Sequence, residues 1–342
     1  MKYISKYNCD VFDVTFRGNL ITVYENNLLI DGNKIDGKFN GFSRIDDKLF
    51  TYDINAGKTI FYSINTLESI YSLNNYLGIR NDIDKRKNRC NYFGQYESID
   101  NEYWVFIDKN TYEIISFFEI NIYNRSLSLI KDECFISKNK DLITLKNIIN
   151  NETIWQQSFT DLLDSEEVLL RYYYVYQEKL ILHLRTNGLS QNKYVSIVLD
   201  VNTGKELYRT EETLGKKLIN GLGYTLYDQT LWISNPETYE VNRIDLSETL
   251  FPLNKIIDDK IGDVDLGKTE VKFRFSPDYF TVEYPYLYFS EQRGQQVGAL
   301  NIETMELVFH TEIEEKGLVK DLKSSNGKFF VHTTENNLYV FG

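Results

Sequence analysis

The segment GDVDLGKT at 262–269 matches the pattern of a phosphate-binding loop letter for letter. Such a loop follows a buried strand and begins a helix, because backbone amides at the helix N-terminus hold the phosphate oxygens. Here the β-rich segment EVKFRFSPDY follows, with Pro277 inside it, and Asp263 and Asp265 would place two negative charges among those oxygens. The same carboxylates suggest a calcium loop, but Gly267 stands where a third ligand is needed. We therefore interpret 262–269 as part of a connecting loop.

Few other residues are suited to chemistry. The chain has three histidines and three widely separated cysteines, which are His183, His310, His332, Cys9, Cys90 and Cys134. No carboxylate stands at a metal-ligand spacing from a histidine, and an odd number of cysteines without a CxxC pair predicts neither a disulfide framework nor a zinc site. The apolar strands ILHL and FVHT favour buried structural roles for two of the histidines. A Ser-His-Asp or Cys-His site assembled from distant segments stays open.

Two charge-rich segments are candidates for binding a partner. The basic segment at 79–90 contains Arg80, Lys85, Arg86, Lys87 and Arg89, and the acidic segment at 254–275 contains Asp258, Asp259, Asp263 and Asp265. The simplest interpretation of each is a solvated surface loop. Because exposed loops often carry binding residues, the basic loop would also suit an acidic partner, and the acidic loop a basic one.

Composition narrows the class of protein. The 342 residues are 42% hydrophobic and 26% charged, as in ordinary globular proteins, and the 15% of aromatic residues favours strands over helices. The net charge of −12 disfavours nucleic acid and anionic membranes as partners and suits a basic one. The first residues, MKYISKYNCDVFDV, lack a signal-peptide pattern, and no apolar run approaches a membrane span. We therefore expect a cytoplasmic protein.

A strand-turn-strand pattern recurs along the chain. In VLDVNTGKELYR, residues 198–209, an apolar strand leads into a polar turn closing on a threonine, and a second strand follows. Six such turns are predicted, 42 to 55 residues apart, with threonines at Thr66, Thr111, Thr153, Thr203, Thr249 and Thr304. Asn or Glu just before the threonine, with Gly204 after it in the fullest copy, suits such a turn because these residues bond nearby backbone amides or tolerate left-handed backbone. Five residues past the threonine an aromatic side chain recurs at Tyr71, Tyr208 and Phe309, where it could pack one unit against the next.

Repeats of this length predict an all-β protein, a single β-propeller domain over 1–342 built from four-stranded antiparallel blades. Upstream of the turns a further pair of strands is recognisable, as in LLRYYYVYQ and KLILHLRT. The C-terminal segment 328–342 lacks an outermost strand, and residues 2–7 could supply it and so close the ring. The paired hairpins ITVYENNLLI and FVHTTENNLYV favour eight blades, whereas the mean spacing favours seven. Segments 79–90 and 254–275 are then loop insertions.

The turn DVNTGKELYR resembles the repeat of PQQ-like, quinoprotein-type propellers, whose signature is an Asp, a Thr-Gly-Lys turn and then a Trp. Asp200, Thr203, Gly204 and Lys205 match, whereas Tyr208 stands where Trp is usual. The resemblance covers one unit well and five loosely, and the marks of WD40 repeats are missing. It implies a fold and leaves the function open, because the superfamily includes enzymes, scaffolds and binding proteins. The adjacent Cys pair and export expected of quinone-dependent dehydrogenases are not seen, so we expect no cofactor.

Two classes of function remain. The first is a non-catalytic propeller in the cytoplasm, a monomer that presents its loops to another protein, for example as a scaffold or an immunity or antitoxin-like protein. The second is an enzyme, such as a lyase, a hydrolase or a quinone-dependent oxidoreductase, with convergent titratable side chains in the central channel. The sequence favours the first, with no catalytic residue, no metal, and no contact with nucleic acid or membrane.

Overall fold

The structure is a computed structural model. It describes residues 1–39, 41–45, 47–74, 77–78, 92–97, 102–108, 111, 113–120, 126–131, 134–139, 141–147, 149–165, 168–176, 178–186, 194–209, 224–227, 230–235, 240–245, 256–261, 275–291, 296–304, 306–313 and 317–342. In the strands within 92–131 and 224–261 it describes the backbone alone. Apart from one short helix, α1 (Phe159–Leu163), the regular elements of these residues are strands.

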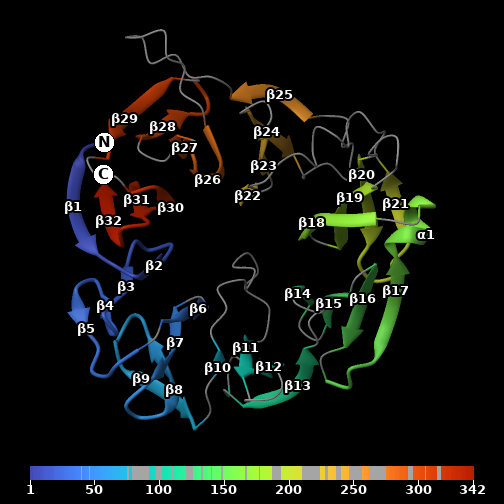
Figure 1. The fold of residues 1–342 in the computed structure, drawn as a ribbon, viewed down its shortest axis with the longest axis horizontal. Helices are drawn as coiled ribbons and strands as arrows, with labels where there is room; N and C mark the ends of the chain where they lie inside the picture. Colours follow the sequence, from blue (N-terminus) through green and yellow to red (C-terminus); the bar gives the residue numbers. More distant parts are fainter. Residues whose placement is uncertain are drawn as a thin grey trace. The chain divides into compact units, whose positions relative to one another are not determined.

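The described strands pair into four-stranded antiparallel sheets (Figure 1). The chain divides into two compact units, one made of Met1–Glu25 with Thr210–Gly342 and the other of Asn26–Arg209. In hydrogen-bonded order, sheets of the first unit are β22 (Tyr224–Tyr227), β23 (Thr230–Asn235), β24 (Glu240–Asp245), β25 (Ile256–Ile261); β26 (Phe275–Glu283), β27 (Tyr286–Glu291), β28 (Gln296–Asn301), β29 (Leu307–Glu312); and β1 (Tyr3–Asn8), β32 (Asn337–Phe341), β31 (Lys328–Thr333), β30 (Val319–Ser325).

The second unit repeats this pattern. Its sheets are β6 (Ser43–Ile45), β7 (Lys48–Asp53), β8 (Lys58–Ser63), β9 (Ser69–Leu73); β10 (Leu77–Gly78), β11 (Tyr92–Glu97), β12 (Glu102–Ile107), β13 (Ile114–Ile120); β14 (Ser126–Lys131), β15 (Cys134–Asn139), β16 (Leu142–Asn147), β17 (Thr153–Ser158); and β18 (Val168–Tyr176), β19 (Lys179–Thr186), β20 (Tyr194–Asp200), β21 (Glu206–Arg209). A further sheet has the order β2 (Val11–Val14), β3 (Leu20–Tyr24), β4 (Asn27–Ile30), β5 (Asn33–Lys34). In six of the sheets every strand has three or more residues, whereas β5 and β10 have two.

Strand β1 completes the last sheet, as the sequence predicts. It pairs antiparallel with β32, and Figure 1 shows the blue β1 beside the red β32, with both chain ends at this sheet. Lys2 and Gly342 exchange two backbone hydrogen bonds of 2.7 and 2.9 Å, and an irregularity between Tyr3 and Ser5 interrupts the ladder. The sheet therefore depends on residues from both ends of the chain.

The turns between third and fourth strands share one chemistry. A side-chain oxygen accepts a hydrogen bond from the amide three residues later, in Ser63–Thr66, Asp108–Thr111, Asn147–Asn150, Asp200–Thr203 and Asn301–Thr304. In four of them the later residue then accepts from the amide two positions on, at Glu68, Glu113, Glu152 and Lys205. These local bonds hold the tight reversal between the two outer strands.

The predicted position of one turn threonine, Thr153, is wrong. The third turn is formed by residues 147–152, where Asn150 takes the place of threonine and Thr153 already begins β17. The amide oxygen of Asn150 accepts the same bond that the threonine hydroxyl accepts elsewhere, so this turn forms without a threonine. The predicted turn at Thr249 lies outside the described residues.

The hydrophobic core lies between the faces of successive sheets. In the first unit, Tyr288, Val297 and Ala299 pack with Phe329 and Phe341 of the next sheet. In the second, the sheets β14–β17 and β18–β21 share a cluster that includes Ile143, Trp155, Leu182, Ile197 and Val201. Burial on both faces is what makes the middle strands read as continuous apolar runs. No helix among the described residues is long and apolar enough to cross a membrane.

Candidate functional site

The residues predicted to bind a partner are placed only in part. Asp258 and Asp259 lie in β25, the outermost strand of its sheet, so residues 256–261 form a strand instead of the predicted loop. The five cations predicted at 79–90 fall outside the described residues, as do Asp263, Asp265 and the rest of the segment 262–269. Their role in binding stays a prediction.

In the first unit, the first strands of successive sheets lie against one another. β26 contacts both β22 and β30, and β30 also contacts β2. Each of these strands lies at an edge of its own sheet. Between β2 and β30, polar side chains meet across the junction of the two sheets.

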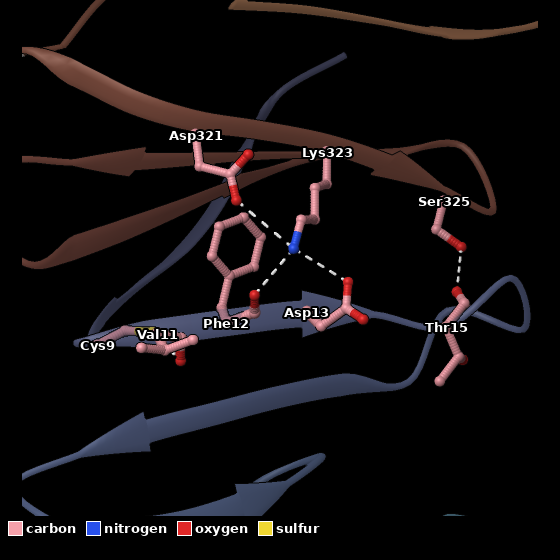
Figure 2. Close-up of polar contacts among 8 residues, drawn as sticks. All are labelled: Cys9, Val11, Phe12, Asp13, Thr15, Asp321, Lys323 and Ser325. Carbon is pink, nitrogen blue, oxygen red and sulfur yellow. Dashed lines mark hydrogen bonds and ion pairs between the residues drawn. The ribbon is translucent and has the colours of Figure 1, made fainter. Parts of the chain in front are cut away.

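The junction between β2 and β30 is built around one lysine (Figure 2). The Lys323 ammonium donates to the carbonyl oxygen of Phe12 at 2.9 Å and to Asp13 Oδ1 at 3.0 Å, and it lies 3.5 Å from Asp321 Oδ2. Its nitrogen also stands 4.6 Å from the centre of the Phe12 ring. Three oxygens therefore face the three N–H donors of this ammonium. We call Phe12, Asp13, Asp321 and Lys323 the Lys323 junction.

The electrostatics of the Lys323 junction favour a permanent cation. Burial alone would lower the pKa of the Lys323 ammonium, but the charges of Asp13 and Asp321 outweigh burial and raise the pKa above its usual value. A lysine that acts as a nucleophile or base needs a lowered pKa instead. The chemistry that this arrangement supports is cohesion between two sheets.

Further contacts hold the same two sheets together at both ends of the junction. Ser325 donates its hydroxyl to the carbonyl oxygen of Thr15, as Figure 2 shows. At the other end, Lys320 donates to Asn336, whose amide in turn donates to Asp10 at 3.0 Å. These side chains satisfy one another across the junction, and their polar atoms stabilise the fold.

Cys9 lies in the same region and is unsuited to nucleophilic chemistry. Its side chain is buried, its thiol donates to the carbonyl oxygen of Val11 at 3.0 Å, and burial together with Asp10 raises the thiol pKa to about 12. A reactive cysteine needs the opposite shift, because the thiolate is the nucleophile. Cys9 is therefore a packing residue.

The three histidines make structural contacts. His183 bonds through Nδ1 to the Ser196 hydroxyl at 2.7 Å, and full burial lowers its pKa to about 3. His332 donates from Nε2 to the carbonyl oxygen of Cys9 at 2.6 Å, and burial is the main cause of its lowered pKa. His310 Nε2 lies 3.0 Å from Gln296 Oε1. No group of three potential metal ligands gathers within the described part of the chain.

A residue that the sequence analysis missed organises a junction in the second unit. Trp155 donates its indole N–H to the carbonyl oxygen of Val201 at 2.7 Å, and its ring lies over Gly204, where a Cβ would come within 2.7 Å of the ring. Trp155 follows Asn151 by four residues, as Tyr208 follows Gly204, and both Asn151 and Gly204 are left-handed. Because the sequence analysis predicts this turn at Thr153 instead of Asn150, it does not align Trp155 with Tyr208.

The outer strand β1 differs from these junctions because it exposes large apolar side chains. Tyr3, Ile4 and Tyr7 are 56%, 52% and 44% exposed. β1 is the last strand in its sheet, and among the described residues no strand pairs with its second edge. We call Lys2, Tyr3, Ile4, Lys6 and Tyr7 the β1 edge.

The sheet that carries the β1 edge is basic, unlike the chain as a whole. The sequences of β1, β32 and β31 are YISKYN, NLYVF and KFFVHT, without an acidic residue in a chain that has 50. Lys2 and Lys328 are exposed beside Gly342, and Lys6 lies 5.4 Å over the Tyr339 ring. The β1 edge therefore combines apolar surface, positive charge and an open strand edge.

Comparison with solved structures identifies the fold. The chain is similar to BamB from Moraxella catarrhalis and to Sqt1 from Saccharomyces cerevisiae, each with a TM-score of 0.54 over 99% of this chain and 98% of the other, at 11% and 12% identity. It is also similar to the beta-propeller domain of Cps50 (Swd1) from Myceliophteria thermophila, with a TM-score of 0.51 over 90% of this chain and 97% of that domain, at 10% identity.

The chain folds as a β-propeller. This confirms the predicted all-β fold with its four-stranded antiparallel sheets and its N-terminal closing strand. Identities of 10% to 12% show the fold alone, so the functions of these proteins do not transfer to this chain. No protein-family model matches the sequence, and no curated protein sequence matches it.

Proposed function

We propose that this protein is a non-catalytic β-propeller that binds another protein. The observation that carries the proposal is the β1 edge, where three large apolar side chains stand exposed on one strand. Exposed apolar clusters are costly in water and are typical of surfaces that a partner covers. β1 and the two strands that follow it in the sheet, β32 and β31, have no acidic residue, so this surface also differs in charge from the chain as a whole.

The buried titratable groups support a binding role in a different way. Lys323 is cationic and shares its donors among Phe12, Asp13 and Asp321, while Cys9 keeps its thiol proton. His183 and His332 have lowered pKa values and bond to Ser196 and to the carbonyl oxygen of Cys9. These groups stabilise the fold through the contacts that they make, whereas an enzyme keeps such groups directed at its substrate.

Finer features belong to the same proposal. The sheets would form eight blades of one propeller in the PQQ-like superfamily, and Trp155, four residues after Asn151, supplies the Trp that its repeat signature expects. The protein would act as a cytoplasmic monomer, as a scaffold or as an immunity or antitoxin-like protein. The cations at 79–90 and the acids at 254–275 would form additional charged contacts with the partner, and neither nucleic acid nor membrane would bind.

A pull-down from native cell extract would test the proposal. The intact protein should retain one protein partner in stoichiometric amount, and variants of the β1 edge or of the 79–90 cations should reduce that recovery. Nuclease treatment and detergent should leave it unchanged. An empty pull-down together with turnover in a screen of sugar, peptide and quinone-linked substrates would refute the proposal in favour of an enzyme.

A further inference from the structure

We infer that the β1 edge binds an extended acidic segment of the partner protein, which adds to the sheet as a further strand antiparallel or parallel to β1. This inference rests on the proposed protein-binding function and assigns its binding surface. Three observations carry it: an available strand edge, exposed apolar side chains along it, and a basic sheet in an acidic chain.

The backbone of β1 offers hydrogen bonds to an added strand. Lys2 and Gly342 exchange both of their backbone bonds, so in the alternating antiparallel pattern the next pair, Tyr3 and Phe341, is a non-bonded pair. The N–H and C=O of Tyr3 therefore point to the open side of β1. An extended peptide can pair with such groups by β-strand addition, in which main-chain bonds supply affinity and side chains supply selectivity.

The side chains of β1 give such a peptide a surface on which to pack. Tyr3, Ile4 and Tyr7 are all exposed, and Tyr3 already packs edge-on against Phe341 of the neighbouring strand. Successive residues of a strand project to opposite faces, so exposed apolar residues at positions 3 and 4 place contact surface on both faces of the edge. An added strand would cover apolar side chains above and below its own backbone.

The positive charge around the β1 edge favours an acidic partner segment. Lys2 and Lys328 each lie beside Gly342, and no acidic side chain belongs to β1, β32 or β31. Carboxylates on the incoming strand would find these cations, whereas a basic segment would be repelled. Two copies of this chain joined edge to edge would bring like charges together, and the irregularity between Tyr3 and Ser5 further disfavours that pairing.

The experiment uses the intact protein and a display library of short random peptides. Enriched peptides should be acidic and free of proline over the pairing segment, because proline lacks the donor that a ladder needs. Their affinities, measured as synthetic peptides by fluorescence anisotropy, should fall roughly tenfold for the Lys2→Glu, Lys328→Glu double variant. Methylation of alternate amide nitrogens of the peptide should abolish binding for one set of positions and spare the other set.

Matched variants separate the backbone from the side chain. Tyr3→Ala keeps the N–H that points to the open edge, whereas Tyr3→Pro removes it, so Tyr3→Pro should weaken binding further. Val308→Thr, at a 47% exposed position in the outer strand β29, should leave binding unchanged. Thermal unfolding of every variant shows whether the fold is retained, and the N-methylated peptides test the pairing without any change to the protein.

The outcomes distinguish this inference from the proposed function. If the peptides bind equally well to all β1 variants, or if every β1 variant recovers the native partner, the β1 edge is not the binding surface. The protein would then still be a protein-binding propeller, but it would bind through a different surface. If a single-stranded oligonucleotide outcompetes the peptides, the ligand of the β1 edge is not an acidic protein segment. If no peptide is enriched and the native pull-down is also empty, both the inference and the proposed function fail.

Discussion

Lysines serve opposite purposes at the Lys323 junction and at the β1 edge. Lys323 keeps 23% of its side chain exposed and has three oxygens around its ammonium, so its charge is neutralised within the protein. Lys2 and Lys328 are exposed on a sheet whose three outer strands have no acid. The comparison shows that the Lys323 junction satisfies its own charges within the protein, whereas β1 leaves positive charge and apolar side chains exposed. Substitutions in the two regions should therefore have different consequences.

The largest effect is expected from Lys323→Met. The substitution leaves the buried carboxylate of Asp13 without its cation, and removing one partner of a buried ion pair costs about 3 kcal/mol, at the lower end of the usual range because Lys323 is partly exposed. The midpoint of urea unfolding measures the loss.

Lys328→Met is the matched control for that prediction, because Lys328 is exposed in β31 of the same sheet, and it should unfold like the wild type. Adding Asp13→Asn to Lys323→Met should restore part of the lost stability. The raised pKa of Lys323 predicts that its contribution is complete below pH 10.5 and disappears only at more alkaline pH. Equal losses for the two lysine variants would contradict the contrast between the two regions.

The next effect is expected from Gly204→Ala at the Trp155 junction. Gly204 has a φ of +68°, which a Cβ disfavours, and the new methyl would also meet the Trp155 ring at 2.7 Å. The loss of unfolding free energy should be roughly 1 to 3 kcal/mol. Gly32→Ala has a similar φ of +81° but nothing within 4 Å, so it isolates the backbone strain and should cost less. Identical losses would show that the contact with Trp155 contributes nothing.

A smaller, pH-dependent effect is expected at His183. Its folded pKa of about 3 lies below the unfolded value of 6.5, so between these limits the unfolded chain binds a proton that the folded chain does not. Stability should fall by about 1.4 kcal/mol for each pH unit below 6.5 on account of this residue. Urea unfolding of the wild type and of His183→Asn at several pH values measures the difference, and a difference that does not change with pH would reject the prediction.

The smallest effect on stability is expected at the β1 edge. Ile4→Thr keeps a β-branched side chain at a 52% exposed position, and unfolding free energy should change by no more than about 0.5 kcal/mol. Val331→Thr, in the same sheet and fully buried, should cost more than 1 kcal/mol, roughly the price of burying a hydroxyl. Differential scanning calorimetry compares the two. A large loss for Ile4→Thr would mean that the β1 edge is part of the core.

The recurring turns made most of the fold predictable, because their chemistry is local. Thr66, Thr111, Thr203 and Thr304 stand where the sequence analysis places them, since the hydrogen bonds that define each turn span only two or three residues. The same locality explains the error at Thr153. An asparagine oxygen accepts the same bond as a threonine hydroxyl, so Asn150 forms a turn that a pattern based on threonine does not predict.

The candidate site was much less predictable. Lys323 and Asp13 are 310 residues apart in the sequence, and only the packing of β30 against β2 brings them together. The charge-rich segments are easily recognised in the sequence, but their structure is not: Asp258 and Asp259, predicted to lie in a loop, belong to strand β25. The β1 edge was predicted to close the last sheet, but its exposed tyrosines required knowledge of which neighbours cover each face.

The pairing of β1 with β32 also bears on how the chain acquires its structure. Among the described residues β1 precedes every other strand and β32 follows them all, so during synthesis β1 waits without its neighbour until those strands have been made. Contacts between such distant segments form slowly, because a very long stretch of chain must first be brought together. A circular permutant with these two ends joined by a short linker would turn the slowest pairing into an ordinary hairpin.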